Sequence, residues 1–132
     1  MSAAPVADNK TAASPVVLVV EDEVLIRMMI AQELRLAGLT VVEAANADEA
    51  MKVLKASPRI RLIMTDLSMP GPMDGTRLAT IVRSTWPHIK IVIVSAFTPQ
   101  WPVAGVEHTY IGKPFNPERM VERVKQLLTT TD

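Results

Sequence analysis

Short apolar runs alternate along the chain with segments whose apolar residues recur every three or four positions. The first run, Val16–Val20, is wholly apolar and rich in β-branched residues, which is typical of a strand buried on both faces. The segment 24–36 follows with one apolar stripe at helical spacing, and Gly38 is a suitable terminator for that helix. The same alternation predicts further strands at 40–44, 62–65, 91–94 and 108–111. It predicts further helices at 46–54 with Asn46 as the cap, near 76–85, and from a cap at Asn116 to about Leu128.

This alternation predicts one α/β domain built on a doubly wound parallel sheet of five strands. Strand–helix–strand units of this length form parallel pairs with right-handed crossovers, and wholly apolar strands require helices on both faces. We expect the domain to span residues 16–128, between a flexible N-terminal tail at 1–15 and a short C-terminal tail at 129–132. Five methionines are expected to fill gaps in the core: Met28, Met29, Met51, Met64 and Met120.

The composition narrows the class of protein. The 132 residues are 48% hydrophobic and 21% charged, and 14 basic residues balance 14 acidic ones, so no basic field indicates nucleic-acid binding. The absence of Cys excludes disulfides and thiolate chemistry. No apolar run approaches the roughly 20 residues of a membrane span, and the N-terminus lacks the features of a secretory signal. We therefore expect a cytoplasmic protein with neither a membrane nor a direct nucleic-acid partner.

Polar residues follow four of the predicted strands at the point where each strand ends. They are Glu21 and Asp22 after the first strand, Asp66 after the third, Ser95 after the fourth and Lys113 after the fifth. In an open α/β sheet, ligands bind outside the carboxyl ends of the strands, so we expect these side chains at one edge. Each residue alone would be interpreted as a cap, a turn residue or a solvated charge. Their joint placement indicates a site.

The residue types at this edge favour phosphoryl transfer. Clustered carboxylates need a cation, and oxygen ligands without His or Cys suit Mg²⁺ or Mn²⁺ rather than zinc. Phosphoryl transfer depends mostly on positioning and charge neutralisation, so a metal, a lysine and a hydroxyl are sufficient. A carboxylate can itself accept the phosphoryl group. The chemistry that fits is formation and hydrolysis of an aspartyl phosphate.

The ordered motifs of the chain resemble those of the receiver domain of two-component response regulators. They are Val17–Glu23, Asp66–Pro70 with Asp74-Gly75, Val94-Ser95-Ala96 and Lys113-Pro114-Phe115. The resemblance covers nearly all of the predicted fold. It implies a stand-alone, CheY-like receiver with the flavodoxin-like strand order 2-1-3-4-5. It also implies a cis peptide bond between Lys113 and Pro114, the less common isomer.

The resemblance gives each residue of the site a role. Asp66 matches the phosphoacceptor, and Lys113 matches the lysine that pairs with a phosphoryl oxygen. Glu21 and Asp22 match the acidic pair that holds Mg²⁺, directly or through water, together with Asp66. The backbone carbonyl of Ser68 matches the third protein ligand of the metal.

Two further residues match the switch of the family, and three features depart from its pattern. Ser95 matches the hydroxyl that turns toward the phosphoryl group, and Tyr110 matches the aromatic residue whose rotation reports the switch. Glu21 stands where Asp is commoner, and the loop 69–75 is longer than the common form. The segment 96–108 is short and contains prolines, so we expect the fourth helix of the family to be shortened, displaced or missing.

The predicted function is that of a phosphoacceptor receiver. It takes a phosphoryl group onto Asp66 from the phosphohistidine of a sensor histidine kinase or a histidine phosphotransfer protein, and it signals to an unknown downstream protein. The only catalysis expected is phosphorylation and autodephosphorylation of Asp66 itself. Two alternatives stay open: a receiver fragment of a larger hybrid kinase or regulator, and a phosphorylation-independent pseudo-receiver.

Particular residues distinguish the predicted receiver from three other classes of protein, of which the pseudo-receiver stays open. A pseudo-receiver would be expected to lack Asp66 or Lys113, and both are present. A phosphatase of the haloacid-dehalogenase type would carry an Asp-x-Asp pattern after the first strand, which 21–23 does not match. A flavodoxin-type flavin carrier needs a loop rich in Ser, Thr and Gly at that place, and an acidic loop would repel the flavin phosphate.

Overall fold

The computed structural model describes residues 15–69, 71, 73–96 and 109–129, which form one five-stranded parallel sheet with helices on both faces. The strands lie in the order β2-β1-β3-β4-β5, which confirms the predicted topology. Their bounds are β1 (Val16–Val20), β2 (Thr40–Ala44), β3 (Ile60–Thr65), β4 (Lys90–Ser95) and β5 (Thr109–Gly112). The helices of the described residues are α2 (Val24–Leu36), α3 (Ala47–Ala56), α4 (Gly75–Thr85) and α5 (Pro117–Thr129).

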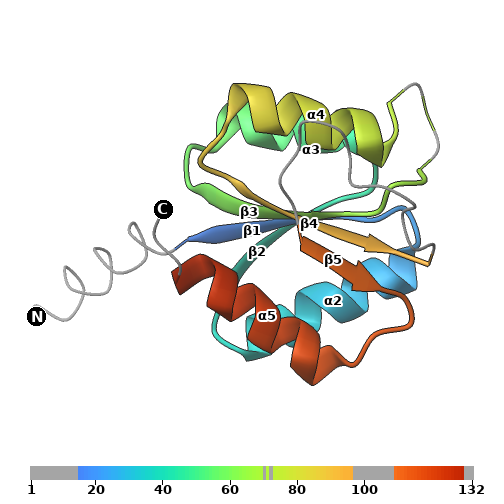
Figure 1. Cartoon of the computed structure of the whole chain (residues 1–132), viewed down its shortest axis with the longest axis vertical. Helices are drawn as coiled ribbons and strands as arrows, with labels where there is room; N and C mark the ends of the chain where they lie inside the picture. Colours follow the sequence, from blue (N-terminus) through green and yellow to red (C-terminus); the bar gives the residue numbers. More distant parts are fainter. Residues whose placement is uncertain (1–14, 70, 72, 97–108, 130–132) are drawn as a thin grey trace, which may run out of the picture.

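The sheet separates two apolar cores. Helices α2 and α5 cover one face of the sheet, and α3 and α4 cover the other (Figure 1). Successive residues of β1 alternate between the cores: Leu18 packs with the residues under α3 and α4, whereas Val19 packs with those under α2 and α5. All five residues of β1 are buried, as a central parallel strand requires. The prediction of a doubly wound α/β domain is confirmed.

Local capping signals set the ends of the helices. The Asn46 side chain accepts a hydrogen bond from the Glu49 amide at 2.8 Å, which confirms the predicted cap of α3. The Asn116 side chain does the same for α5, with the Arg119 amide at 3.0 Å. Gly38, at a φ of 93°, closes α2 in the left-handed conformation that glycine adopts without strain.

The helix 75–85 begins earlier than the spacing of apolar residues predicts. Asp74 is its cap, because the Asp74 side chain accepts a hydrogen bond from the Arg77 amide at 3.0 Å. Gly75 is therefore the first residue of α4 and lies inside the fold, where it is buried. This placement brings the start of α4 against the end of β3.

One expectation about the core is wrong. Met64 and Met120 are buried as predicted, but the side chain of Met28 is 54% exposed. Met28 lies on the outer side of α2, away from the stripe that packs on the sheet through Ile30 and Leu34. Three apolar side chains, Val24, Leu25 and Met28, are thus left in solvent near the start of α2.

Three segments with sequence-based expectations lie largely outside the described residues. They are the N-terminal tail, of which only Pro15 is described, the segment 97–108, where we expect a shortened, displaced or missing helix, and the C-terminal tail, of which only Thr129 is described. These expectations stay predictions. Within the described part of the chain, no helix is long and apolar enough to cross a membrane.

Candidate functional site

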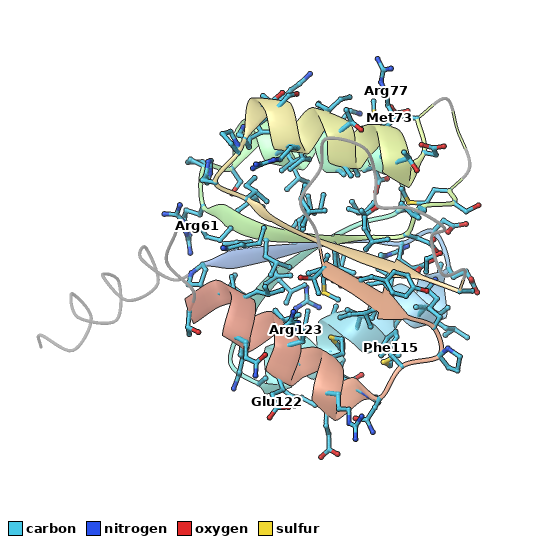
Figure 2. All side chains as sticks on the ribbon, viewed as in Figure 1. Arg61, Met73, Arg77, Phe115, Glu122 and Arg123 are labelled. Carbon is cyan, nitrogen blue, oxygen red and sulfur yellow. The ribbon has the colours of Figure 1, made fainter. Side chains whose placement is uncertain are left out.

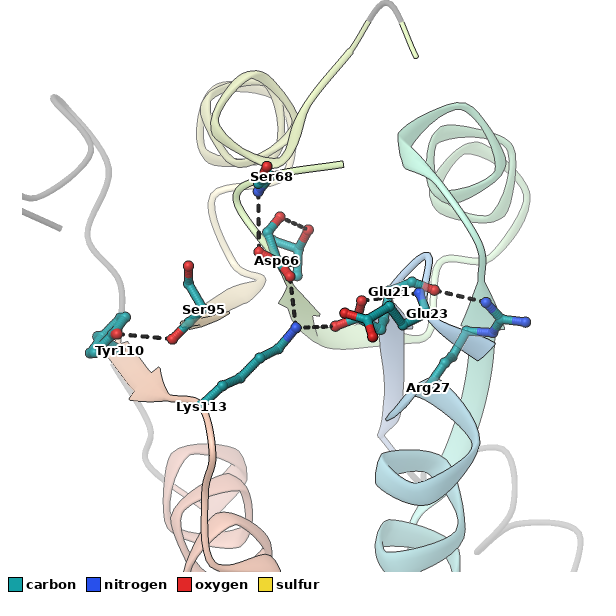
Figure 3. A network of polar contacts seen from close by, with 9 residues as sticks. Glu21, Glu23, Arg27, Asp66, Ser68, Ser95, Tyr110 and Lys113 are labelled. Carbon is teal, nitrogen blue, oxygen red and sulfur yellow. Dashed lines mark hydrogen bonds and ion pairs between the residues drawn. The ribbon is translucent and has the colours of Figure 1, made fainter. Parts of the chain in front are cut away.

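The candidate site lies at the carboxyl edge of the sheet, where polar residues meet at the ends of separate strands (Figure 3). Glu21 follows β1, Asp66 follows β3, Ser95 ends β4, and Lys113 follows β5. Because β1 and β3 are neighbours in the sheet, the first two carboxylates lie side by side. The parallel arrangement of the strands thus brings distant parts of the sequence together at the edge of the sheet where open α/β folds bind their ligands.

Lys113 joins the two carboxylates. Its Nζ atom lies 2.6 Å from Glu21 Oε1 and 2.7 Å from Asp66 Oδ2, so one ammonium serves both groups. The three side chains are largely withdrawn from solvent, with 13% of Lys113, 2% of Glu21 and 12% of Asp66 exposed. The group of three carries one more negative than positive charge. A second cation, or a group that relieves the excess of negative charge, would be stabilised here.

The other oxygen of each carboxylate is held by its own loop. Asp66 Oδ1 accepts a hydrogen bond from the Ser68 amide at 3.1 Å, and Glu21 Oε2 accepts one from the Glu23 amide at 3.1 Å. Thr65 Oγ1 donates to the Asp66 carbonyl at 2.9 Å. Each carboxylate therefore has a fixed orientation, with one oxygen on a backbone amide and one on Lys113.

The ionisation of Glu21 and Lys113 reflects burial and pairing. Burial raises the pKa of Glu21 above its ordinary value, against the hydrogen bond from Lys113 that favours the charged form. Burial acts to lower the pKa of Lys113, but the hydrogen bonds to Asp66 and Glu21 together raise it. Lys113 is consequently positively charged at neutral pH.

A glycine forms the wall behind Asp66. The Gly75 amide donates to the Leu67 carbonyl at 2.9 Å, which draws the start of α4 onto the loop after β3. A Cβ atom at Gly75 would overlap the backbone carbonyl of Asp66. Only glycine fits this close approach of two backbones. The Asp74-Gly75 pair is part of the family pattern, but the spacing of residues in the sequence does not reveal the contact.

Ser95 and Tyr110 are joined through the backbone of Ser95. The Ser95 carbonyl accepts a hydrogen bond from the Tyr110 hydroxyl at 2.9 Å and another from the Lys113 amide at 2.9 Å. Ser95 itself is buried, and Tyr110 is partly buried against the core that lies under α3 and α4. The end of β4 is thereby tied to Tyr110 and to the backbone of Lys113. The Lys113–Pro114 peptide bond is cis, as the resemblance implies.

The residues that are predicted to bind a metal are only partly brought together. Glu21 and Asp66 both bind the Lys113 ammonium, which brings their carboxylates close together. Carboxylate oxygens suit Mg²⁺, with water as its other ligands. Asp22 is exposed on the loop after β1. Within 15–69, 71, 73–96 and 109–129, no three His, Cys, Asp or Glu residues gather closely enough to enclose a metal. The metal-binding roles of Asp22 and of the Ser68 carbonyl remain predictions.

A second ionic group, which the sequence does not reveal, lies behind Glu21. Arg27 of α2 donates from Nη1 to the Glu21 carbonyl at 2.7 Å, and its Nε lies 3.4 Å from Glu43 Oε1 on β2. The contact depends on how α2 is rotated against β2, and neither motif nor spacing indicates it. Figure 3 shows the guanidinium on the far side of Glu21 from Lys113.

The fold and the site together define a flavodoxin-like α/β domain with an acidic site at the carboxyl edge of its sheet. Comparison with known proteins identifies the family. The sequence model of the response regulator receiver domain matches residues 17–125. The chain belongs to the receiver domain family, which confirms the resemblance seen in its motifs.

Individual relatives agree with this assignment. Sensor kinase CckA of Brucella abortus is 34% identical over 125 residues, which is 90% of this chain but only 13% of that protein. A CheY-like receiver domain protein from Methanospirillum hungatei has a similar structure, with a TM-score of 0.79 and 28% identity over 87% of this chain and 94% of that one. TrrA of Thermotoga maritima, solved in complex with Mg²⁺-BeF, has a TM-score of 0.77 and 29% identity, covering 86% of this chain and 98% of that one.

Proposed function

We propose that Asp66 of this receiver domain accepts a phosphoryl group from a phosphohistidine. An Asp66 carboxylate oxygen attacks phosphorus, the bond between phosphorus and the imidazole nitrogen breaks, and the imidazole leaves with the bonding electron pair. The donor is a sensor histidine kinase or a histidine phosphotransfer protein. The phosphorylated domain signals through contacts with another protein.

One observation carries this proposal: the Lys113 ammonium is 2.7 Å from Asp66 Oδ2 and is held there by Glu21. A phosphoryl group attached to Asp66 would add negative charge beside this ammonium, which is the charge compensation that phosphoryl transfer needs. Asp66 keeps part of its surface open to solvent, so a donor has access to it. The arrangement suits an acceptor carboxylate better than a structural ion pair on the protein surface.

Mg²⁺ is the cofactor that this site would use. The cluster has an excess of negative charge, and its oxygen atoms, each of which accepts one hydrogen bond, are of the type that Mg²⁺ prefers as ligands. We propose Glu21, Asp22 and Asp66 as the carboxylates that hold the ion, with the Ser68 carbonyl as a further ligand. The ion would neutralise the charge of the transferring group, while Lys113 holds an adjacent phosphoryl oxygen.

The surface beside the site favours a protein as the donor. The side chains of Val24, Leu25 and Met28 are 54%, 80% and 54% exposed at the start of α2, directly after the loop that holds Glu21. Exposed apolar side chains that follow directly after a site loop are typical of a surface that docks another protein. A small phosphodonor would gain nothing from these side chains.

Ser95 and Tyr110 are proposed to carry the response to phosphorylation. The Tyr110 hydroxyl is bound to the Ser95 carbonyl, so a movement of Ser95 toward the phosphoryl group would disturb the position of Tyr110. Tyr110 lies on the edge strand β5, where a change of its side chain alters the outer surface. Such a coupling would convert a local change of charge into a change of surface.

Intact-mass measurement with a small phosphodonor and Mg²⁺ tests the acceptor. The wild-type protein should gain the mass of one phosphoryl group, and Asp66→Asn should gain none. Asp74→Asn is a matched control, because it removes a carboxylate from the same loop and keeps a side chain that caps α4. The control should be phosphorylated as the wild type is.

The measurement separates the alternatives. If Asp66→Asn gains a phosphoryl group, Asp66 is not the acceptor. The same conclusion follows if Asp74→Asn is the one protein of the three that gains none. A wild-type protein that gains no phosphoryl group from a small donor is next given a phosphorylated histidine kinase. Failure with both donors would reject the proposal in favour of a pseudo-receiver.

A further inference from the structure

Arg27 connects the candidate site to the edge of the sheet. Its side chain is 16% exposed and lies between two groups: the Glu21 carbonyl, 2.7 Å from Nη1, and the Glu43 carboxylate, 3.4 Å from Nε. A guanidinium holds its N–H donors in one rigid plane, so these two contacts fix a direction as well as a distance. Among the described residues, Arg27 contacts neither Asp66 nor Lys113, so its direct contact with the site is through Glu21.

The Glu21 carbonyl lies just beyond the end of β1. The Glu21 amide still donates to the Ala44 carbonyl at 3.1 Å, but β1 has ended at Val20 and the carbonyl lies beyond the strand. Arg27 supplies a hydrogen bond to this buried carbonyl. The same residue carries, on its side chain, the carboxylate that holds Lys113. A turn of the Glu21 peptide would therefore move that carboxylate.

Glu43 keeps Arg27 in place. Arg35, two turns further along α2, binds the same carboxylate with Nη1 at 3.0 Å and donates from Nη2 to the Val41 carbonyl at 3.0 Å. Glu43 thus lies between two arginines of one helix and is part of β2, which pairs with β1. The helix, the edge strand and the loop that holds Glu21 are joined by this one group of charges.

We infer that Arg27 is a positioning residue of the phosphoacceptor site, which orients Glu21 toward Lys113 and Asp66; this inference rests on the proposed function. The guanidinium holds the Glu21 peptide from behind, and the Glu21 carboxylate holds the Lys113 ammonium against Asp66 in front. Loss of Arg27 releases the peptide, and the Glu21 carboxylate loses its fixed distance to the ammonium and to any ion that the site binds.

The test compares Arg27→Gln with Arg35→Gln, two variants that each remove one arginine from Glu43. Only the first removes a contact to Glu21. The metal-free readout is the Lys113 side-chain ammonium signal in proton–nitrogen spectra, which is visible while the ammonium is held and protected from water. It should be retained in Arg35→Gln and lost in Arg27→Gln, even where both variants lose the same thermal stability.

The second readout is Mg²⁺ affinity, measured from the amide shift of Ser68 during a titration with Mg²⁺ alone. Loss of a residue that orients a metal ligand typically weakens binding about tenfold or more, and we expect this for Arg27→Gln. Removal of a positive charge would by itself tighten the binding of a cation, so the sign of the change separates positioning from a simple field effect. Arg27→Lys keeps the charge but cannot donate in two fixed directions, and it should also bind Mg²⁺ more weakly.

Three results would overturn the inference: an unchanged Lys113 signal in Arg27→Gln, tighter Mg²⁺ binding by that variant, or wild-type affinity in Arg27→Lys. The proposed function has a different point of failure, which is the absence of a phosphoryl adduct on the wild-type protein. Because the ammonium signal needs neither metal nor phosphodonor, it tests the role of Arg27 even if that adduct does not form.

Discussion

Two groups of three charged residues lie on either side of the Glu21 peptide, and they are opposites in composition. In the first group, Lys113 binds two carboxylates, Glu21 and Asp66. In the second, Glu43 binds two arginines, Arg27 and Arg35. The first has an excess of negative charge and the second an excess of positive charge.

The two groups differ in how far their excess charge is exposed to water. Arg27 and Arg35 each direct a further N–H donor to a backbone carbonyl, and Arg35 is 49% exposed to water. The excess charge of the second group is therefore solvated. The first group is largely buried, and its carboxylates use their remaining oxygens on one loop amide each. A buried excess of negative charge is destabilising unless a cation binds and compensates it. Such an uncompensated charge is typical of a functional site rather than of a structural ion pair.

The largest effect is expected where the buried group loses its cation. Lys113→Met leaves Glu21 and Asp66 facing each other without compensation, which should lower the free energy of unfolding by about 3 kcal/mol and the rate of phosphorylation by about a hundredfold. Urea denaturation and intact mass measure the two effects. Mg²⁺ should restore more stability to this variant than it adds to the wild type. The exposed Lys125→Met is the control, and an equal loss in both variants would contradict this interpretation.

A smaller effect is expected from crowding the backbone beneath Asp66. Gly75→Ala places a methyl group where the Asp66 carbonyl lies, and the loop must shift. We expect a loss of about 2 kcal/mol in the free energy of unfolding, together with slower phosphorylation. Thr76→Ala, an exposed neighbour on the same helix, should change neither. Wild-type phosphorylation by Gly75→Ala would show that the loop tolerates displacement.

The pH dependence of stability tests the burial of Glu21. Because the pKa of Glu21 is raised above 4.5 in the folded state, the native protein binds more protons than the unfolded chain just above that pH. The resulting stabilisation is complete below the unfolded pKa and is lost as the pH rises through the folded pKa. Without metal, Glu21→Gln should therefore gain stability relative to the wild type as the pH rises through this range. A constant difference between their thermal unfolding curves would contradict the raised pKa.

The smallest effect is expected in the solvated group. Glu43→Gln removes two ion pairs that are partly exposed, and it should lower the free energy of unfolding by only about 0.5 kcal/mol. Added salt should reduce the difference further, because it screens exposed charges. A loss as large as that of Lys113→Met would remove the contrast between the two groups.

The sequence predicts the framework of the fold because the signals are local. Val16–Val20 is recognisable as a buried strand from its own residues, and Asn46 and Asn116 are recognisable as caps. The edge that holds the site follows from parallel strands alone, because Glu21, Asp66 and Lys113 come directly after strands.

What the sequence does not predict depends on side-chain direction and on packing between elements. Glu21 and Asp22 are adjacent and both acidic, yet only Glu21 is buried and bound to Lys113. Met28 resembles the core methionines in sequence but lies on the outer side of α2. The role of Arg27 requires the orientation of α2 against β2 to be known.

The contact between Lys113 and Glu21 joins residues that are 92 positions apart, and the contact between Lys113 and Asp66 spans 47. Contacts of such long range require the entropy of long chain loops to be lost before they can form. The complete site therefore exists only after β5 has docked at the edge of the sheet. A nascent or truncated chain that ends before β5 would display Asp66 without its ammonium. Phosphorylation at the full rate would accordingly report that β5 has docked and that the domain is completely folded.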